Sequence, residues 1–188
     1  YMGIGKSDII LDLRQSDQIR KQFEEMVSYV KKDQDVEKYA PFVTCRFDII
    51  NQDGVPESLY IETGDFTIFP INYLKGEPPA DSNEIALSYL SASELEKKIG
   101  DELKIIINGK RQGLTVAGIY QDITNGGKTA KASIAPEHET ASWYMINLNV
   151  NGDIPVKVDD YEDVYKGAKG YHIKVHIEQT FTDTIDQL

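Results

Sequence analysis

Length, composition and charge limit what this chain can be. Its 188 residues are 40% hydrophobic, which is enough to fill the core of one domain or of two small lobes. The 31 acidic and 20 basic residues give a net charge of -11, which repels phosphate backbones, so no nucleic-acid partner is expected. The single cysteine excludes an intramolecular disulfide framework.

The chain opens with a predicted strand over residues 7–14 and a predicted helix over residues 16–32. Ser16 or Asp17 is expected to cap the start of this helix. One helix face is apolar, and it consists of Ile19, Phe23, Met26, Val27 and Val30. We expect that face to pack on a sheet.

Two further strands are predicted over residues 41–50 and 57–62. Asp53-Gly54 lies between them and favours a hairpin turn, because glycine tolerates the positive φ that such turns need. The order strand, helix, strand, strand indicates an α+β lobe whose helix covers one face of its sheet.

The middle of the chain is irregular at first and then rich in strands. Residues 64–80 carry three prolines and predict a crossing to a second lobe. Short strands are predicted over residues 84–87, 103–107 and 114–120. Asn108-Gly109 separates the last two and indicates a hairpin, for which we expect a loop longer than two residues.

A short helix is predicted over residues 91–99 of this second lobe. Ser91 is its expected N-cap, Glu94 takes the capping-box position, and Gly100 is expected to end it. The second lobe is therefore predicted to be β-rich with one short helix.

The last part of the chain predicts strands over residues 143–150 and 171–177, with Val164 and Tyr165 on a short acidic turn or helix. No apolar run approaches the roughly 20 residues that a membrane-spanning helix needs. The sequence starts with Tyr1, and its final residues keep helical spacing without a stop signal, so we expect it to be part of a longer protein. The residues at that spacing are Ile177, Phe181, Ile185 and Leu188.

Residues 122–129, with the sequence DITNGGKT, imitate a phosphate-binding loop because they follow a strand and end in Gly-Lys-Thr. Asp122 stands where that motif has its first glycine, and its charge would oppose a phosphate. The residues that follow are a poor helix because Pro136 interrupts them. We interpret the segment as a surface loop, with a nucleotide site as the alternative.

The histidines suggest a metal only at first sight. His172 and His176 would share one face of a helix, but their neighbours alternate as in a strand. Four residues of strand span roughly 13 Å, which is too far for two ligands of one ion. His138 lies between Glu137 and Glu139 and is interpreted as a loop residue.

An acidic run could suggest calcium, but its spacing does not fit an EF-hand loop. Counted from Asp159, the sixth position is Val164 where the motif has glycine, and the twelfth is Gly170 where it has glutamate. We interpret the run as solvated surface, with an adventitious cation as the alternative. It consists of Asp159, Asp160, Glu162 and Asp163.

Nothing in the sequence assembles a catalytic centre. Cys45 lies in an apolar strand, where an inert buried thiol is expected, and no Gly-x-Ser-x-Gly motif occurs. We therefore predict a protein that is not an enzyme, with no catalytic residues, no cofactor or cofactor-binding residues, and no metal ligands.

A series of short motifs from Leu74 to Asp122 occurs in a characteristic order. It begins with Leu-x-Gly-Glu-x-Pro, continues with an apolar strand ending in Ser88, and then with Ile-Gly-Asp at residues 99–101. It ends with Val-Ala-Gly-Ile-Tyr-Gln-Asp at residues 116–122. This order resembles the extracytoplasmic domain, the MacB-like periplasmic core, of MacB-like and FtsX-like ABC transporter permeases.

The resemblance implies a two-lobed α+β fold. Residues 1–61 and 142–188 would form a discontinuous porter-like α/β lobe, and residues 62–141 an inserted β-rich lobe containing a short helix. It also implies that flanking membrane helices anchor the domain on the extracytoplasmic face of the bacterial cell membrane.

The resemblance further implies a non-catalytic role in coupling cytoplasmic ATP hydrolysis to export, or to action on an extracytoplasmic partner. The expected partners are a cytoplasmic ABC ATPase subunit, a second or related permease, and an extracellular peptide, lipoprotein or cell-wall partner. Two alternatives stay open, namely a secreted or anchored recognition module and a small nucleotide-dependent enzyme that uses residues 122–129.

Overall fold

A computed structural model describes residues 4–13, 17–167 and 173–177. By its internal contacts the chain divides into an α/β unit, Lys6–Phe42 with Trp143–Leu188, and a β unit, Tyr1–Gly5 with Val43–Ser142. The long strands β2 (Val36–Ile50) and β9 (Ala141–Val150) contribute residues to both units. The predicted α+β class is confirmed, and the lobe boundaries predicted after residues 61 and 141 stay a prediction.

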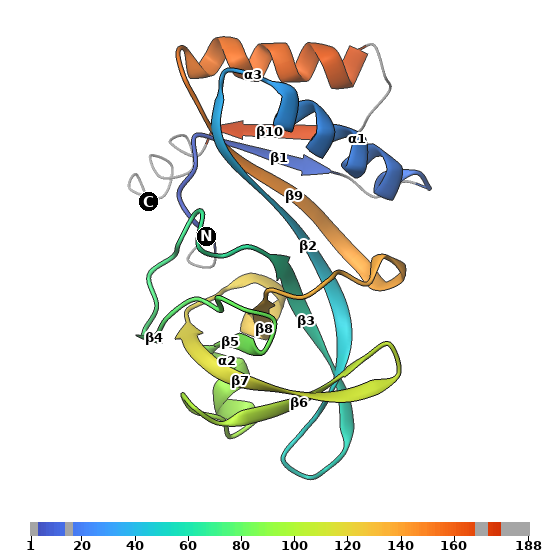
Figure 1. The fold of residues 1–188 in the computed structure, drawn as a ribbon, viewed down its shortest axis with the longest axis vertical. Helices are drawn as coiled ribbons and strands as arrows, with labels where there is room; N and C mark the ends of the chain where they lie inside the picture. Colours follow the sequence, from blue (N-terminus) through green and yellow to red (C-terminus); the bar gives the residue numbers. More distant parts are fainter. Residues whose placement is uncertain (1–3, 14–16, 168–172, 178–188) are drawn as a thin grey trace. The chain divides into compact units, whose positions relative to one another are not determined.

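The α/β unit contains a sheet in the order β10, β1, β9, β2 (Figure 1). β1 (Ile9–Leu13) lies between β10 (Ile173–Ile177) and β9 and is antiparallel to both. Ile9 and Leu11 of this central strand are fully buried. The strand predicted at residues 7–14 is thus present over Ile9–Leu13, and the strand predicted at residues 171–177 is present over its described residues.

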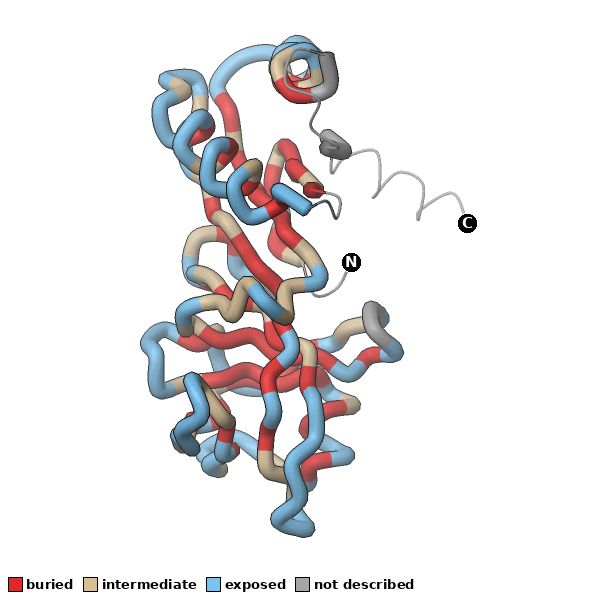
Figure 2. Tube along the Cα trace, turned by 90° about the vertical axis from the view of Figure 1, so that its right-hand side faces the viewer, coloured by how far each residue is buried: buried red, intermediate tan, exposed pale blue. Residues whose placement is uncertain are grey.

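α1 (Ile19–Lys32) covers this sheet through the apolar face that its spacing predicts. Phe23 meets Tyr144 of β9 edge to face, with 4.9 Å between the ring centroids. Each buried side chain of this kind contributes roughly 1.5–3 kcal/mol to stability. The outer face of α1 is exposed (Figure 2). Its buried residues are Ile19, Phe23, Met26 and Val30.

The expected cap of α1 was wrong. Gln18 is the N-cap residue, and its side chain makes no capping hydrogen bond. Asp17 precedes this residue, and Ser16 is outside the described residues. Ile19, the first residue of the helix, is already buried. Packing on the sheet therefore fixes the start of α1 without a side-chain cap.

α3 (Ile154–Glu162) was not predicted, although its start carries clear signals. Asp153 is its N-cap, whose carboxylate accepts a hydrogen bond of 3.1 Å from the Val156 N–H, and proline follows in the first turn. The turn η3 (Asp163–Gly167) continues the helix and contains Val164 and Tyr165, as predicted.

In the β unit the strands close into a ring. β2, β3, β8, β5 and β7 are neighbours in that order, and β6 pairs with both β7 and β2. The contact that closes the ring joins Ile49 to Ile105. The bounds are β3 (Pro56–Gly64), β5 (Glu84–Ser88), β6 (Glu102–Ile107), β7 (Lys110–Tyr120) and β8 (Thr129–Ala132). Closure leaves these strands fewer unpaired edges and surrounds an apolar core.

The short strand β4 (Lys75–Gly76) adds to the outside of β7. Gly76 has a φ of 70°, and a Cβ atom at this residue would lie 2.0 Å from the carbonyl oxygen of Ala117. Only glycine fits both the backbone angle and this close approach. The structure thus explains why the third position of the Leu-x-Gly-Glu-x-Pro motif is glycine.

Two local expectations in the β unit were wrong. The hairpin between β6 and β7 has the two-residue turn Asn108-Gly109, with φ of 50° and 76°, instead of a longer loop. The short helix α2 (Tyr89–Glu94) is capped by Ser88, whose hydroxyl accepts a 3.2 Å hydrogen bond from the Ser91 N–H. Ser91 is therefore inside the helix, and α2 ends well before Gly100.

Candidate functional site

The loop at residues 122–129 is tied to the β unit through its own side chains and backbone. It contains the 3-10 turn η1 (Thr124–Gly127) and leads into β8, so a strand stands where a phosphate-binding loop has a helix. The Ser88 hydroxyl donates to the Gly127 carbonyl at 2.6 Å and accepts from the Thr129 N–H at 3.2 Å.

The charged residues of this loop already have partners. The Thr129 hydroxyl donates to the Asp122 carboxylate. Lys128 lies 2.8 Å from a carboxylate oxygen of Glu94, and this hydrogen bond raises the pKa of the lysine. The loop therefore joins β7 to β8 with a fixed hydrogen-bond pattern instead of presenting a helix N-terminus to an anion.

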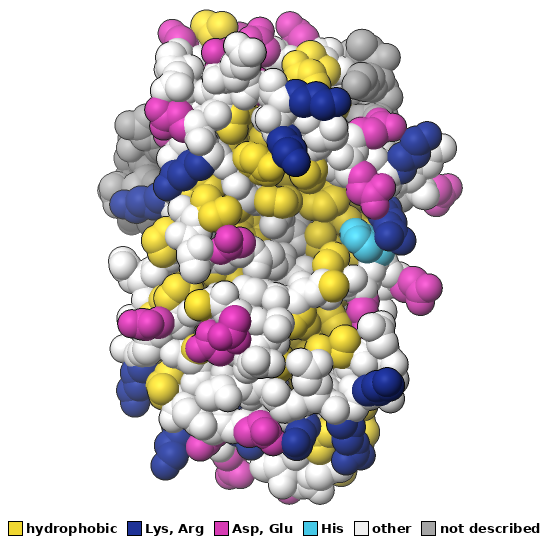
Figure 3. All heavy atoms as spheres, viewed as in Figure 1, with side chains coloured by type: hydrophobic (Ala, Val, Ile, Leu, Met, Phe, Trp, Pro, Cys, Tyr) yellow, Lys and Arg dark blue, Asp and Glu magenta, His cyan; other side chains and the backbone are white. Residues whose placement is uncertain are grey.

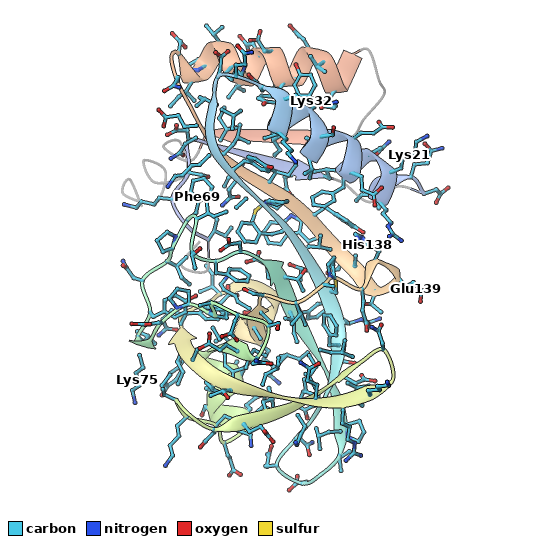
Figure 4. All side chains as sticks on the ribbon, in the orientation of Figure 1. Lys21, Lys32, Phe69, Lys75, His138 and Glu139 are labelled. Carbon is cyan, nitrogen blue, oxygen red and sulfur yellow. The ribbon has the colours of Figure 1, made fainter. Side chains whose placement is uncertain are left out.

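The three histidines do not come together in the described part of the chain. His176 lies in β10 opposite Ile10, and His172 is outside the described residues. His138 begins the 3-10 turn η2 (His138–Thr140), beside Glu139 (Figure 4). Among the described residues, no group of three or more histidine, cysteine or acidic side chains is arranged to hold a metal ion.

The acidic run lies on helical backbone, not in a cation-binding loop. Asp159 and Asp160 are exposed residues of α3, and Asp163 begins η3.

Cys45 is fully buried in β2, and this burial raises the pKa of its thiol to about 11. The thiol is therefore protonated at neutral pH, as expected for an inert buried cysteine.

The most buried charged pair of the β unit, Lys131 with Glu62, was not anticipated from the sequence. The parallel pairing of β3 and β8 places these residues opposite each other. The ammonium lies 2.7 Å from a Glu62 oxygen, and the two side chains are only 6% and 13% exposed. The same ammonium is 5.1 Å from the ring centroids of Phe66 and Tyr120, a distance that suits cation–π attraction.

Tyr120, which lies beside the Lys131 ammonium, also belongs to a set of hydrogen-bonded hydroxyl groups. Tyr120 and Thr129 share a 2.9 Å hydrogen bond between their hydroxyls. The Thr129 hydroxyl in turn donates to the Asp122 carboxylate. Burial, together with the nearby carboxylates, raises the pKa of Tyr120 well above its usual value. Tyr73 packs edge to face on Tyr120, and its buried hydroxyl has no hydrogen-bond partner within the described part of the chain.

The α/β unit has its own lysine cluster, which holds α3. Lys157 lies 2.6 Å from Asp33 and 3.0 Å from Asp35. The Tyr161 hydroxyl donates to the same Asp33 carboxylate at 2.9 Å. Burial opposes ionisation of Asp33, but the hydrogen bonds from Lys157, the Asp35 backbone and Tyr161 outweigh it and lower its pKa. Tyr29 of α1 packs on Tyr161 with 5.7 Å between centroids.

Three exposed apolar residues of the β unit lie near the end of β7 in sequence or in strand pairing. Tyr89 directly follows Ser88, which is the register partner of Tyr120, and Ile123 comes shortly after the strand. On the other side of β7, the Leu74 N–H donates to the Ile119 carbonyl. Tyr89, Ile123 and Leu74 are 58%, 69% and 52% exposed.

Surface charge is mixed on the face drawn in Figure 3, where acidic and basic side chains are interspersed. Lys21 and Lys32, labelled in Figure 4, both belong to α1. On this face the described residues form no basic stripe of the kind typical of nucleic-acid binding.

The fold is shared with domains of transport proteins. The periplasmic region of MacB from Actinobacillus actinomycetemcomitans superimposes with a TM-score of 0.59 at 11% identity, over 99% of this chain and 95% of that one. A domain of a putative permease protein from Porphyromonas gingivalis gives 0.54 at 13% identity, over 91% and 90%. The extracellular domain of the ABC-type transporter YknZ from Gram-positive bacteria gives 0.57 at 12% identity, over 88% and 98%.

The resemblance inferred from the sequence is thus confirmed at the level of fold. No family model and no curated protein matches the sequence. In the described part of the chain, no helix has the length and apolar character that crossing a membrane requires. The chain has the fold of the extracytoplasmic domain of MacB, and its candidate sites are the two buried lysine clusters and the exposed apolar residues at the end of β7.

Proposed function

We propose that this chain is the non-catalytic extracytoplasmic domain of a MacB-like or FtsX-like ABC transporter permease. The observation that carries the proposal is the extent of the fold similarity, which takes in 99% of this chain and 95% of the MacB periplasmic region. A shared fold alone does not define a function. Three neighbours from transporters or permeases, two of them described as periplasmic or extracellular domains, support the same placement for this chain.

In this proposal, ATP hydrolysis by a cytoplasmic ABC subunit moves the membrane helices of the permease, and the outer domain transmits that movement. It does so by changing between discrete arrangements of rigid parts. The output is expulsion of a substrate or a force on an extracytoplasmic peptide, lipoprotein or cell-wall partner. A second or related permease completes the transporter.

The structure of the β unit suits a part that must keep its shape under load. Its strands close into a ring, and the buried Lys131–Glu62 pair joins the neighbouring strands β3 and β8 of that ring. The loop at residues 122–129 is fixed by hydrogen bonds to Ser88 and Asp122. These features support a mechanical role.

The complete reading frame tests the proposal. We expect one membrane span directly before this domain and three after it, with a gene for an ATPase subunit nearby. A reading frame that encodes a secretion signal, this domain and no spans would contradict the proposal. That result would instead favour a secreted or anchored recognition module.

A further inference from the structure

The chain contains three Asn-Gly pairs, Asn108-Gly109, Asn125-Gly126 and Asn151-Gly152. Asparagine is chemically labile in proteins, and glycine is the following residue that hinders reaction at its side chain least, because it has no Cβ. In the reaction, the backbone nitrogen of the glycine must approach Cγ of the asparagine. The three pairs lie in different backbone settings, so the fold decides which of them can reach that geometry.

Asn151-Gly152 lies in the short connection between β9 and α3. Both residues are exposed, and a Cβ added to Gly152 would meet no atom within 4 Å. The Asn151 N–H donates to the Asp35 carbonyl at 2.8 Å, which fixes the amino side of the residue. Among the described residues, neither the Asn151 side-chain amide nor the Gly152 N–H has a hydrogen-bond partner. No hydrogen bond of these two groups in the described part of the chain therefore opposes rotation about ψ of Asn151.

The other two Asn-Gly pairs lie within turns of regular secondary structure. Asn108 has a φ of 50° in the hairpin turn, and the flanking residues Ile107 and Lys110 are paired in the ladder of β6 and β7. Turning Gly109 toward the Asn108 side chain would open the end of that hairpin. Asn125-Gly126 lies inside η1, so its backbone is part of a 3-10 turn.

We propose that Asn151 is a site of spontaneous deamidation directed by the fold. The Gly152 nitrogen attacks Cγ of Asn151, the bond from Cγ to the amide nitrogen breaks, and ammonia leaves with the proton from the Gly152 N–H. The product is a five-membered succinimide. Water then opens the ring at either carbonyl, which gives an aspartyl or an isoaspartyl residue at position 151. Water is the only co-reactant, and no oxidant or reductant takes part.

The modified residue would be next to the cluster of Lys157, Asp33 and Asp35 that attaches α3 to the α/β unit. The Asn151 N–H bonds to Asp35, and Asp35 is also a partner of Lys157. The aspartyl product keeps the backbone and adds one negative charge close to the start of α3, where the helix dipole favours it. The isoaspartyl product adds an atom to the main chain, which displaces the hydrogen bond to Asp35. Its effect on α3 is therefore expected to be the larger one.

Peptide mapping by mass spectrometry tests the proposal on the folded domain. After incubation at neutral and at mildly alkaline pH, we expect the peptide containing Asn151 to gain about one dalton and to split into two products of equal mass. This gain should be at least about five-fold faster than at Asn108, which corresponds to about 1 kcal/mol. In the denatured chain the two rates should become similar, since the hairpin no longer protects Asn108.

Matched variants separate the chemistry from its consequence. Asn151→Gln should abolish the mass gain at position 151 without changing the rate at Asn108. Asn151→Asp imitates one product and should leave the melting temperature within about 1 °C of the original, whereas the isolated isoaspartyl form should melt about 2–4 °C lower. Equal rates at Asn108 and Asn151 in the folded domain, or no conversion at Asn151, would overturn the proposal.

Discussion

The two units each bury a lysine against carboxylates, but they surround those carboxylates with different hydrogen-bond donors. In the β unit, Lys131 lies against Glu62, and both side chains are almost completely covered. In the α/β unit, Lys157 is shared between Asp33, which is 11% exposed, and Asp35, which is 65% exposed. When Lys157 is lost, Asp33 keeps the hydrogen bonds from the Tyr161 hydroxyl and the Asp35 N–H, whereas Glu62 loses the donor that balances its charge. The same mutation should therefore cost more at Lys131.

The comparison also separates two structural tasks. Glu62 and Lys131 join neighbouring strands within a closed ring. Asp33 and Lys157 join the end of α1 to α3, far apart in the sequence, together with the Tyr161 hydroxyl. Loss of the first pair is expected to affect the stability of the β unit, and loss of the second the attachment of one helix.

The largest effect is predicted for Lys131→Met. It leaves the Glu62 carboxylate buried without its counter-charge, so the free energy of unfolding should fall by about 3–5 kcal/mol. Denaturant unfolding followed by circular dichroism measures this change. The double variant Lys131→Met with Glu62→Gln should recover most of the loss. A single-variant loss below about 1 kcal/mol would show that water reaches Glu62.

A smaller loss is predicted for Lys157→Met. Asp33 keeps the hydrogen bond from Tyr161, so the free energy of unfolding should fall by about 1–3 kcal/mol in the same assay. Asp35→Asn, the exposed partner, serves as the matched control and should change stability by less than about 1 kcal/mol. If Lys157→Met cost more than Lys131→Met, the contrast between the two units would be wrong.

Acid should weaken the α/β cluster. The folded-state pKa of Asp33 lies below its ordinary value of 3.8. The stabilisation is therefore present above pH 3.8 and is lost as the pH falls through the lower folded value. Melting temperatures measured across this acid range should fall less steeply for Asp33→Asn than for the original chain. Identical slopes would mean that Asp33 gains nothing from Lys157 and Tyr161.

The smallest effect is predicted at a third lysine pair, which is exposed. Lys128 and Glu94 are 54% and 45% exposed, so Lys128→Ala should leave the melting temperature unchanged within error. Millimolar ATP should also produce no stabilisation in either protein. A rise in melting temperature with ATP that disappears in Lys128→Ala would favour the nucleotide-dependent enzyme instead.

Several elements were predictable because local sequence determines them. The apolar spacing of α1 predicted the residues that it buries, and strands were expected where β1, β3, β6 and β9 lie. β8 was missed because Thr-Ala-Lys-Ala has a weak strand propensity and owes its burial to neighbours. α3 was missed although Asp153 and the following proline mark its start, since its apolar spacing is weak.

The buried clusters could not be predicted, because strand register and helix packing create them. Glu62 and Lys131 are 69 positions apart, and only the parallel pairing of β3 with β8 brings them together. Asp33 and Tyr161 are separated by 128 positions. In an acidic chain, nothing local distinguishes these carboxylates from the solvated ones. The fold similarity, in contrast, was visible in the order of short motifs such as the one containing Gly76.

Thiol labelling in intact cells tests most directly whether this domain lies outside the membrane. Cys45 is fully buried, so in the original protein this domain is expected to stay unlabelled by a membrane-impermeant maleimide, as read from the mass of its peptides. Ile123 is 69% exposed, and Ile123→Cys provides one accessible thiol. The account predicts that this variant is labelled in intact cells as fully as after lysis. Labelling only after lysis would contradict it.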